Sequence, residues 1–523
     1  MKNYLKFLPF LALGIISCEP DLSNPIDEAG FYTNGEADFS NYVALGNSLA
    51  AGYADGALYI TGQENSYPNI LAQQFSLVQK TDVFKQPLMA DNAGGLLAGG
   101  TQLPGFNNRR VLAVGPTGPF PQIYTGMAPT TDIINLLSGP FNNMGVPGAK
   151  SFHLLALGYG NVEGVALGTA NPYFVRFASS PQTSIISDAV AQNPTFFSLM
   201  AGENDVLSYA TSGGTGVDQT GITDVTTYGS NDITDPQAFA SVYSQIVTSM
   251  VETGAGGVLS SVPDVTTIPF FTRVTFNPLT KSVLGGGDEA VGVATINALN
   301  AQLYGPLNQA LTAYGAGDRI NLMSTTTDFN PLLIKDETLT DLSVELTAAF
   351  TPSLGAQTAA IYGNVFGQAR QAKAGDLVLL TTSSVIGTAP EGVPAPLDKF
   401  GITYPLQDEH VLIPTEIQAI SVATMAYNVT IKALADANGL AYADLNAFLN
   451  QLSNVGIPYD AGTLTSEFVL GGAYSLDGVH ATPRGYAAMA NLIIDAVNLK
   501  YKSTVPKVNI GNYATVTLSN EVQ

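Results

Sequence analysis

The feature that most constrains the fold is an alternation of short apolar runs with amphipathic helix signals. The apolar runs cover residues 42–46, 195–201 and 258–262. One helix signal is Asp235 followed by Pro236, after which an apolar stripe with helical spacing runs to Gly254. This alternation predicts an α/β fold, in which a parallel sheet carries helices on both faces and ligands bind at the carboxyl ends of the strands.

A serine and a histidine stand where such a site would form. Ser48 follows the first apolar run, and His480 precedes Thr482 and Pro483, which predict the start of a helix. A serine hydroxyl needs a general base within hydrogen-bond reach, and His480 is the candidate base. Asp477, three residues before it, has the spacing to hold the imidazole in one tautomer and to stabilise the imidazolium.

Acyl transfer also needs N–H donors where negative charge develops on the carbonyl oxygen. The sequence offers the backbone N–H groups of Ser48 and Gly145 and the side-chain amide of Asn204. Each such donor contributes roughly 100- to 1,000-fold in rate.

Four short motifs carry a family resemblance. They are Gly46-Asn47-Ser48-Leu49, Asn143-Met144-Gly145, Gly202-Glu203-Asn204-Asp205 and Asp477-Gly478-Val479-His480. In type and order they resemble blocks I, II, III and V of the SGNH, or GDSL-type, hydrolases. The resemblance implies a three-layer α/β sandwich with Ser48 as nucleophile, Asp477 and His480 completing the triad, and Ser48, Gly145 and Asn204 as the oxyanion hole.

The chain departs from that family in two places. Asn47 replaces the usual aspartate of block I, which affects local hydrogen bonding more than the attack itself. The gap between Asn204 and Asp477 is far longer than a minimal member needs, and residues of about 321–412 are rich in Pro, Gly and Thr. We expect this segment to be an insertion beside the site, in which residues 376–382 read as a strand.

The apolar, glycine-rich residues 92–106 are a further candidate for an acyl pocket or lid.

Other site chemistries fit poorly. One cysteine and three dispersed histidines do not make a typical zinc site, so no metal or cofactor is expected. His153 reads as a boundary histidine and His410 as a solvated one. The polar residues 213–235 lack EF-hand spacing and read as a surface loop rather than a calcium site.

The N-terminus predicts export and lipid anchoring. Lys2 and Lys6 precede an apolar run too short to span a bilayer, which is typical of a signal peptide. Cys18, the only cysteine, ends a segment that resembles a bacterial lipobox, and Glu19 after it favours the outer membrane. We therefore expect a signal peptide at 1–17, a lipid-anchored tether at 18–40 and a hydrolase domain at 41–523, with the leaflet and the oligomeric state left open.

Composition agrees with a folded, exported protein. The chain is 46% hydrophobic and carries a net charge of −22, which disfavours nucleic acid as a partner. The expected function is hydrolysis of carboxylic esters, with lipid or other apolar esters slightly favoured and acetyl groups on polysaccharide as the rival. Two alternatives are a surface binding lipoprotein that has lost turnover and a structural partner of an outer-membrane complex.

Overall fold

A sheet of five parallel strands lies at the centre of the molecule, whose computed structural model describes residues 31–115 and 118–522. The strand order is β13-β8-β7-β1-β6. The strands are β1 (Tyr42–Gly46), β6 (Asn143–Gly145), β7 (Phe196–Met200), β8 (Gly256–Ser260) and β13 (Ala441–Ala443). All residues of β1 and β7 are buried, as in parallel strands that are covered on both faces.

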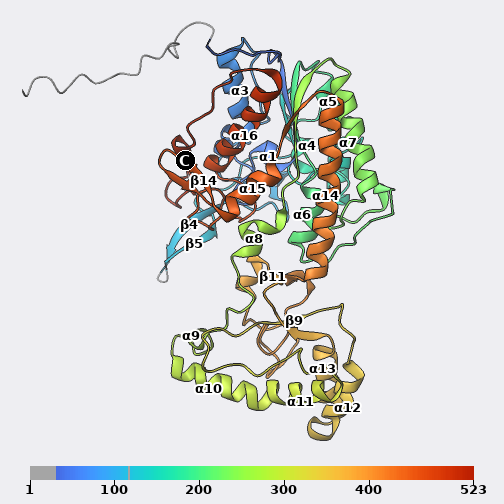
Figure 1. Cartoon of the computed structure of the whole chain (residues 1–523), viewed down its shortest axis with the longest axis vertical. Helices are drawn as coiled ribbons and strands as arrows, with labels where there is room; N and C mark the ends of the chain where they lie inside the picture. Colours follow the sequence, from blue (N-terminus) through green and yellow to red (C-terminus); the bar gives the residue numbers. More distant parts are fainter. Residues whose placement is uncertain (1–30, 116–117, 523) are drawn as a thin grey trace, which may run out of the picture.

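Helices cover both faces of this sheet, which confirms the predicted α/β class (Figure 1). One face carries α3 (Tyr67–Val78) and α16 (Pro483–Tyr501). The other carries α5 (Ile185–Val190), α7 (Pro236–Val251) and α14 (Pro414–Ala437). The larger hydrophobic core fills the space between these helices and the strands.

The helices begin where the sequence predicts. The Asp235 side chain accepts hydrogen bonds from the backbone N–H groups of Gln237 and Ala238, which caps α7. Thr482 caps α16 by accepting from the N–H of Gly485. Because α16 starts three residues after His480, this cap fixes where the chain leaves the site.

Shorter elements connect the layers. The helices are α1 (Ser48–Ala51), α2 (Ile60–Glu64), α4 (Pro172–Val175), α6 (Asn204–Thr211), α8 (Pro269–Thr272) and α15 (Leu445–Asn454). Three antiparallel hairpins are β2 (Leu97–Ala98) with β3 (Thr101–Gln102), β4 (Arg110–Gly115) with β5 (Gly118–Ile123), and β14 (Ile457–Tyr459) with β15 (Gly462–Leu464).

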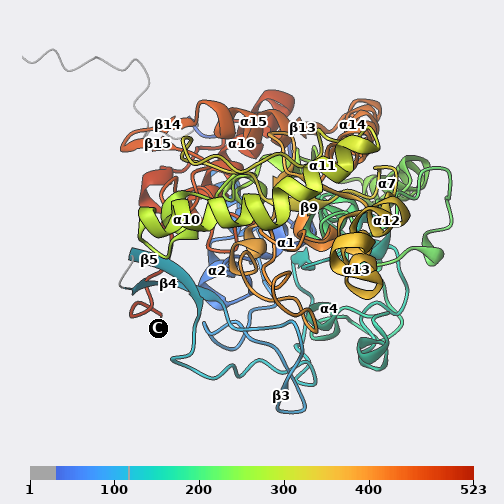
Figure 2. The ribbon, with the colours of Figure 1, turned by 90° about the horizontal axis from the view of Figure 1, so that it is seen from below.

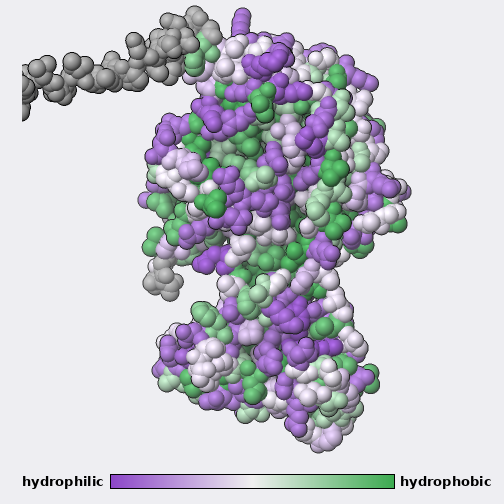
Figure 3. All heavy atoms as spheres, viewed as in Figure 1, coloured by the Kyte–Doolittle hydropathy of each residue, from purple (hydrophilic) through white to green (hydrophobic). Residues whose placement is uncertain are grey.

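A second lobe with its own hydrophobic core lies below the sheet (Figure 1). Its helices are α9 (Lys281–Leu284), α10 (Glu289–Leu299), α11 (Gly305–Ala313), α12 (Ser343–Leu354) and α13 (Ala356–Phe366), and its strands are β9 (Leu333–Lys335), β10 (Ala369–Gln371), β11 (Leu377–Val378) and β12 (Val411–Leu412). Seen from below, α10 and α11 cross the lobe in one run (Figure 2). The space-filling view shows a waist between the lobes, where hydrophobic side chains are present at the surface (Figure 3).

The lobe differs from the expected segment in extent and in detail. Its buried core runs from Leu279 to Ile413, so the predicted range of 321–412 covers only its later part. The predicted strand at residues 376–382 is also wrong in length. Only Leu377 and Val378 form a strand, and a 3-10 helix follows at Leu380–Ser384. Asp376 instead closes a turn, because its carboxylate accepts from the N–H of Lys373 and pairs with Arg370.

The folded domain begins before residue 41, which corrects the C-terminal end of the tether predicted at 18–40. Phe39 is fully buried and stacks on Phe75 with ring centroids 4.0 Å apart. The N–H of Glu36 donates to the carbonyl of Tyr501 at 2.7 Å. Cys18 and the predicted signal peptide at 1–17 lie outside the described residues. Within the described part of the chain, no helix combines the length and apolarity needed to cross a membrane.

Candidate active site

Ser48 lies at the carboxyl end of the central strand. β1 ends at Gly46, Asn47 caps the short helix α1, and Ser48 is the first residue of that helix. Gly46 is required here, because a Cβ would lie 2.3 Å from the carbonyl oxygen of Met200 and 2.9 Å from the Cβ of Ala50. The strand end therefore passes close to its neighbours and presents Ser48 at the edge where parallel sheets bind ligands.

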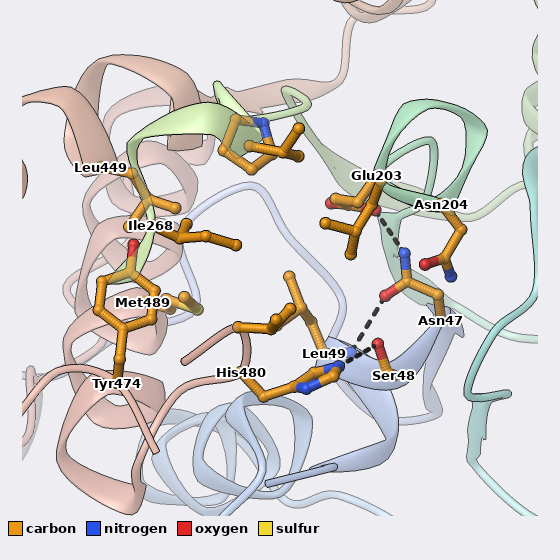
Figure 4. Close-up of a pocket in the computed structure, with 14 residues that line it drawn as sticks. Asn47, Ser48, Leu49, Glu203, Asn204, Ile268, Leu449, Tyr474, His480 and Met489 are labelled. Carbon is orange, nitrogen blue, oxygen red and sulfur yellow. Dashed lines mark hydrogen bonds between the residues drawn. The ribbon is translucent and has the colours of Figure 1, made fainter. Parts of the chain in front are cut away.

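His480 joins Ser48 to Asp477. The His480 Nε2 atom lies 2.9 Å from the Ser48 Oγ (Figure 4). On the other side of the ring, the Nδ1 atom lies 2.8 Å from the Asp477 Oδ2. Because an ionised carboxylate only accepts, Nδ1 carries the proton and Nε2 accepts from the serine hydroxyl. The three predicted triad residues are thus brought together in the order that general-base activation needs.

Asp477 is held ionised by its surroundings. Burial alone would raise its pKa, but the charge of His480 and the hydrogen bonds to the carboxylate lower the pKa well below the ordinary value. One oxygen accepts from the backbone N–H groups of Val479 and His480, and the other accepts from Gly56 at 2.8 Å. The carboxylate is therefore fixed before it orients the imidazole.

A tight turn and a ring contact position the imidazole. The N–H of Ser475 donates to the carbonyl of His480 at 2.8 Å, and Gly478 within the turn has a φ of +73°. The ring of Tyr53 packs against His480 with centroids 4.6 Å apart. The turn leads directly into α16, so the imidazole is anchored by a long buried helix.

The Asn204 side chain and the backbone N–H of Ser48 are hydrogen-bond donors close to the Ser48 hydroxyl. The N–H of Ser48 lies in the first turn of α1, where backbone N–H groups have no acceptor within the helix. The Asn204 side chain is 6% exposed, lies on the same cavity as Ser48 and uses one of its two N–H groups to donate to the carbonyl of Ala149 at 2.9 Å. The amide donates to no other described residue.

Gly145 does not supply the predicted donor. The N–H of Val146 donates to the carbonyl of Gly46 in β1, and successive N–H groups of a strand point to opposite edges. The N–H of Gly145 accordingly points away from β1 and donates to the side chain of Asn143 at 3.0 Å. The sequence motif does not indicate the direction of this N–H, because the pairing of the strands sets it.

Gly148, three residues later, has the accessibility that Gly145 lacks. It is exposed, has a φ of +80°, and has no described heavy atom within 4 Å of the position that a Cβ would take. Its N–H donates to no other described residue. The adjacent Ala149 accepts from Asn204, so this loop lies against the amide that faces the site.

Asn47 and Glu203 form a buried pair beside Ser48. The Asn47 amide donates to one Glu203 oxygen at 2.5 Å, while its own oxygen accepts from the N–H of Leu49 at 3.0 Å. Burial raises the pKa of Glu203 to about 7, and nearby Asp205 acts in the same direction. The only sign of this pair in the sequence is the unusual residue at position 47.

A small, mostly apolar cavity of about 40 Å³ opens beside these residues. Figure 4 shows Ser48, His480, Asn47, Glu203 and Asn204 on one side of it, with Tyr474, Leu449 and Met489 opposite. Further apolar walls come from Leu49, Leu207, Val265 and Ile268. The segment 92–106, a candidate for an acyl pocket, contributes no residue to these walls and packs into a separate apolar cluster.

The remaining histidines and the polar loop have local structural contacts. His153 and His410 each accept from a backbone N–H three residues earlier, at 3.0 Å. Burial lowers the pKa of His153 to about 4, and Lys150 adds to this effect. In the 213–235 loop, the Asp232 carboxylate accepts from the N–H groups of Val217 and Gly229. Among the described residues, no three His, Cys, Asp or Glu side chains are grouped to hold a metal ion.

Comparisons with known proteins give no match. Neither a protein-family model, nor a curated protein, nor a solved structure matches this chain.

Proposed function

We propose that this chain is a serine hydrolase of the SGNH type that cleaves carboxylic esters. The observation that carries the proposal is the hydrogen-bonded series from Ser48 through His480 to Asp477. Its members come from positions 432 residues apart, and the series lies on a cavity large enough for a small group. A histidine buried for packing alone needs neither a serine hydroxyl on one nitrogen nor a fixed carboxylate on the other.

The proposed reaction passes through an acyl-enzyme. The Ser48 Oγ attacks the ester carbonyl carbon while His480 accepts the serine proton, and the imidazolium is stabilised by Asp477. The tetrahedral intermediate collapses, and His480 gives the proton to the departing alcohol. Water then attacks the acyl group with His480 as base, which releases the carboxylic acid and restores Ser48. The reaction needs no metal or cofactor.

The oxyanion hole of this proposal uses Ser48, Asn204 and Gly148. The N–H of Gly148 replaces that of Gly145, which already donates to Asn143. The three donors would thus come from α1, α6 and the loop after β6. Preorganised donors of this kind stabilise charge as it develops and need no reorganisation during the reaction.

The size of the cavity bears on the substrate. About 40 Å³ holds roughly three water molecules by volume, or an acyl group of similar bulk. This favours short acyl groups, such as the acetyl groups of a polysaccharide, over the long-chain lipid esters that composition alone favoured. Release of acetate rather than fatty acid from candidate substrates distinguishes these two classes.

Hydrolysis of 4-nitrophenyl acetate by the purified mature protein tests the proposal. Ser48→Ala and His480→Ala should each lower kcat/KM at least about 1,000-fold, because the triad acts as a unit. Ser76→Ala, an exposed serine on α3, is the matched control and should keep wild-type activity. A binding lipoprotein or structural partner gives no Ser48-dependent hydrolysis, which is the outcome that contradicts the proposal.

We also propose that Cys18 is acylated and anchors the protein to the outer membrane. The basis is the lipobox-like sequence that ends at this single cysteine. Cys18→Ser should move the protein from the membrane fraction to the soluble fraction and abolish incorporation of labelled palmitate. Ser17→Ala, which keeps the cysteine, is the control. Membrane association that survives Cys18→Ser contradicts the anchor.

A further inference from the structure

Glu203 presents a buried carboxyl oxygen to the cavity. The residue is 4% exposed, and its Oε2 accepts from the Asn47 amide at 2.5 Å. Its Oε1 is also buried and has no hydrogen-bond partner among the described residues. Figure 4 shows one carboxyl oxygen directed to Asn47 and the other toward the interior of the cavity.

An acceptor in this position is costly unless something binds it. A buried polar atom without a partner keeps its full desolvation penalty. No basic side chain of the described chain forms an ion pair with Glu203. The raised pKa of this carboxyl, about 7, reflects the same lack of a compensating donor or cation. The missing partner is therefore a hydrogen-bond donor from outside the described part of the chain.

The position of Glu203 indicates which part of a substrate supplies that donor. Glu203 immediately precedes Asn204, whose amide is a proposed oxyanion donor, and its partner Asn47 immediately precedes Ser48. The carboxyl thus lies beside the place where an ester carbonyl would bind. A donor on the acyl chain close to that carbonyl would face Oε1.

We propose that the cavity takes a short acyl group bearing a hydroxyl or ammonium group near its carbonyl, and that this group donates to Glu203. The proposal rests on the esterase function proposed above. It names a substrate class, esters of small hydroxy or amino acids, for which Glu203 is the specificity-determining residue. The cavity of about 40 Å³ has room for an acyl group of a few heavy atoms.

Three methyl esters of equal heavy-atom count test the proposal. Methyl lactate, alanine methyl ester and methyl isobutyrate carry a hydroxyl, an ammonium or a methyl group on the same carbon, and methanol release measures their hydrolysis. We expect wild-type kcat/KM for lactate or alaninate to exceed that for isobutyrate by about 10- to 100-fold, the range for a hydrogen bond to a charged group. The better of the two polar esters identifies the donor.

Two variants assign the preference to a residue. In Glu203→Gln, the amide oxygen must accept from Asn47, which turns the amide N–H groups toward the cavity. The kcat/KM for the polar esters should then lie within about threefold of that for methyl isobutyrate. The ammonium ester should show the largest fall in kcat/KM. Tyr474→Phe removes the hydroxyl of Tyr474, which lines the same cavity and also lacks a partner among the described residues. Tyr474 is thus the rival partner for the donor, and this variant should keep the wild-type ratio of the kcat/KM values whatever its overall activity.

The outcomes separate this proposal from the esterase function. Ser48-dependent hydrolysis of all three esters at similar kcat/KM overturns the proposal and leaves the esterase function intact. A preference that survives Glu203→Gln, or that disappears in Tyr474→Phe, overturns the role of Glu203. Absence of Ser48-dependent hydrolysis for these esters and for 4-nitrophenyl acetate overturns both. If circular dichroism shows that Glu203→Gln is unfolded, the wild-type ratio alone decides.

Discussion

Position 47 shows how one atom changes the environment of Ser48. The Asn47 side chain accepts from Leu49 with its oxygen and donates to Glu203 with its nitrogen. An aspartate has the same shape but cannot donate when ionised, so it would face the Glu203 carboxyl without a hydrogen bond. The asparagine and the buried glutamate therefore form a matched pair.

Glu203 should make the stability of the protein depend on pH. Burial raises its pKa from the ordinary 4.5 to about 7, so between these values the folded state binds more protons than the unfolded chain. The part of the free energy of unfolding that is linked to Glu203 is then fully present below about pH 4.5 and is lost as the pH rises through 7. Glu203→Gln removes this dependence and should raise the free energy of unfolding by roughly 2–3 kcal/mol at pH 8, with little change at pH 4.5.

Urea unfolding of both proteins at these two pH values measures the difference. If Glu203→Gln changes the free energy of unfolding equally at pH 4.5 and pH 8, or lowers it at pH 8, the raised pKa of Glu203 is contradicted. A higher free energy of unfolding for Glu203→Gln at pH 8 would also show that the Glu203 carboxyl lowers the stability of the wild-type protein, as is usual for functional groups.

A double-mutant cycle tests the pairing of the two residues. Asn47→Asp should lower the free energy of unfolding by about 1–3 kcal/mol at pH 8, because a buried hydrogen bond is lost between two carboxyl groups. In the Glu203→Gln background, the same change should cost little, because the glutamine amide can donate to Asp. Urea unfolding gives the interaction energy, and additive effects of the two substitutions rule out the coupling.

For single residues, the sequence predicted which side chains lie together better than it predicted the directions of backbone N–H groups. Ser48, His480 and Asp477 lie together as expected, because the order and type of the motif residues carry that information. The N–H of Gly145 faces away from β1, since strand pairing fixes which N–H groups face a neighbour. Glu203 was missed for a related reason, because its burial depends on tertiary packing.

Long elements with clear patterns were predictable, and short ones were not. The predicted apolar run at 42–46 is β1, and the predicted helix after Asp235 is α7. By contrast, β6 and β13 are strands of three residues each, too short to show a period. The predicted strand at 376–382 failed because the ion pair of Asp376 with Arg370 closes a turn.

The turn between Asp477 and His480 should tolerate no side chain at its glycine. Gly478 has a φ of +73°, and a Cβ there would lie 2.9 Å from the Leu380 Cδ2 and 3.2 Å from the Phe270 nitrogen. Gly478→Ala should therefore displace His480 and lower kcat/KM for 4-nitrophenyl acetate by about 100-fold or more, as misplaced catalytic groups do.

Gly254, which follows α7, is the matched control for that change. It has a φ of +86° and open space around the Cβ position. Gly254→Ala should show the cost of the left-handed backbone, on the order of 1 kcal/mol in urea unfolding, while activity is kept. Equal activity in the two alanine variants is the result that contradicts the role of the turn.

For the molecule as a whole, the sequence indicated two parts but misjudged their boundaries. The second core starts at Leu279, whereas the loosened composition begins only near residue 321. Helices α10 and α11 account for the difference, because a helical pattern does not reveal which of two cores a helix packs against. At the other end, Phe39 belongs to the main core although its neighbours are polar.

We propose that Ser48 is activated by residues that most of the chain separates from it in sequence. A fluorophosphonate probe, with the modified peptide identified by mass spectrometry, distinguishes an activated Ser48 from an ordinary serine. We expect an adduct on Ser48 in the wild type, none in Ser48→Ala, and labelling slowed at least about 1,000-fold in His480→Ala. An adduct on another residue, or equally fast labelling without His480, would rule out this activation.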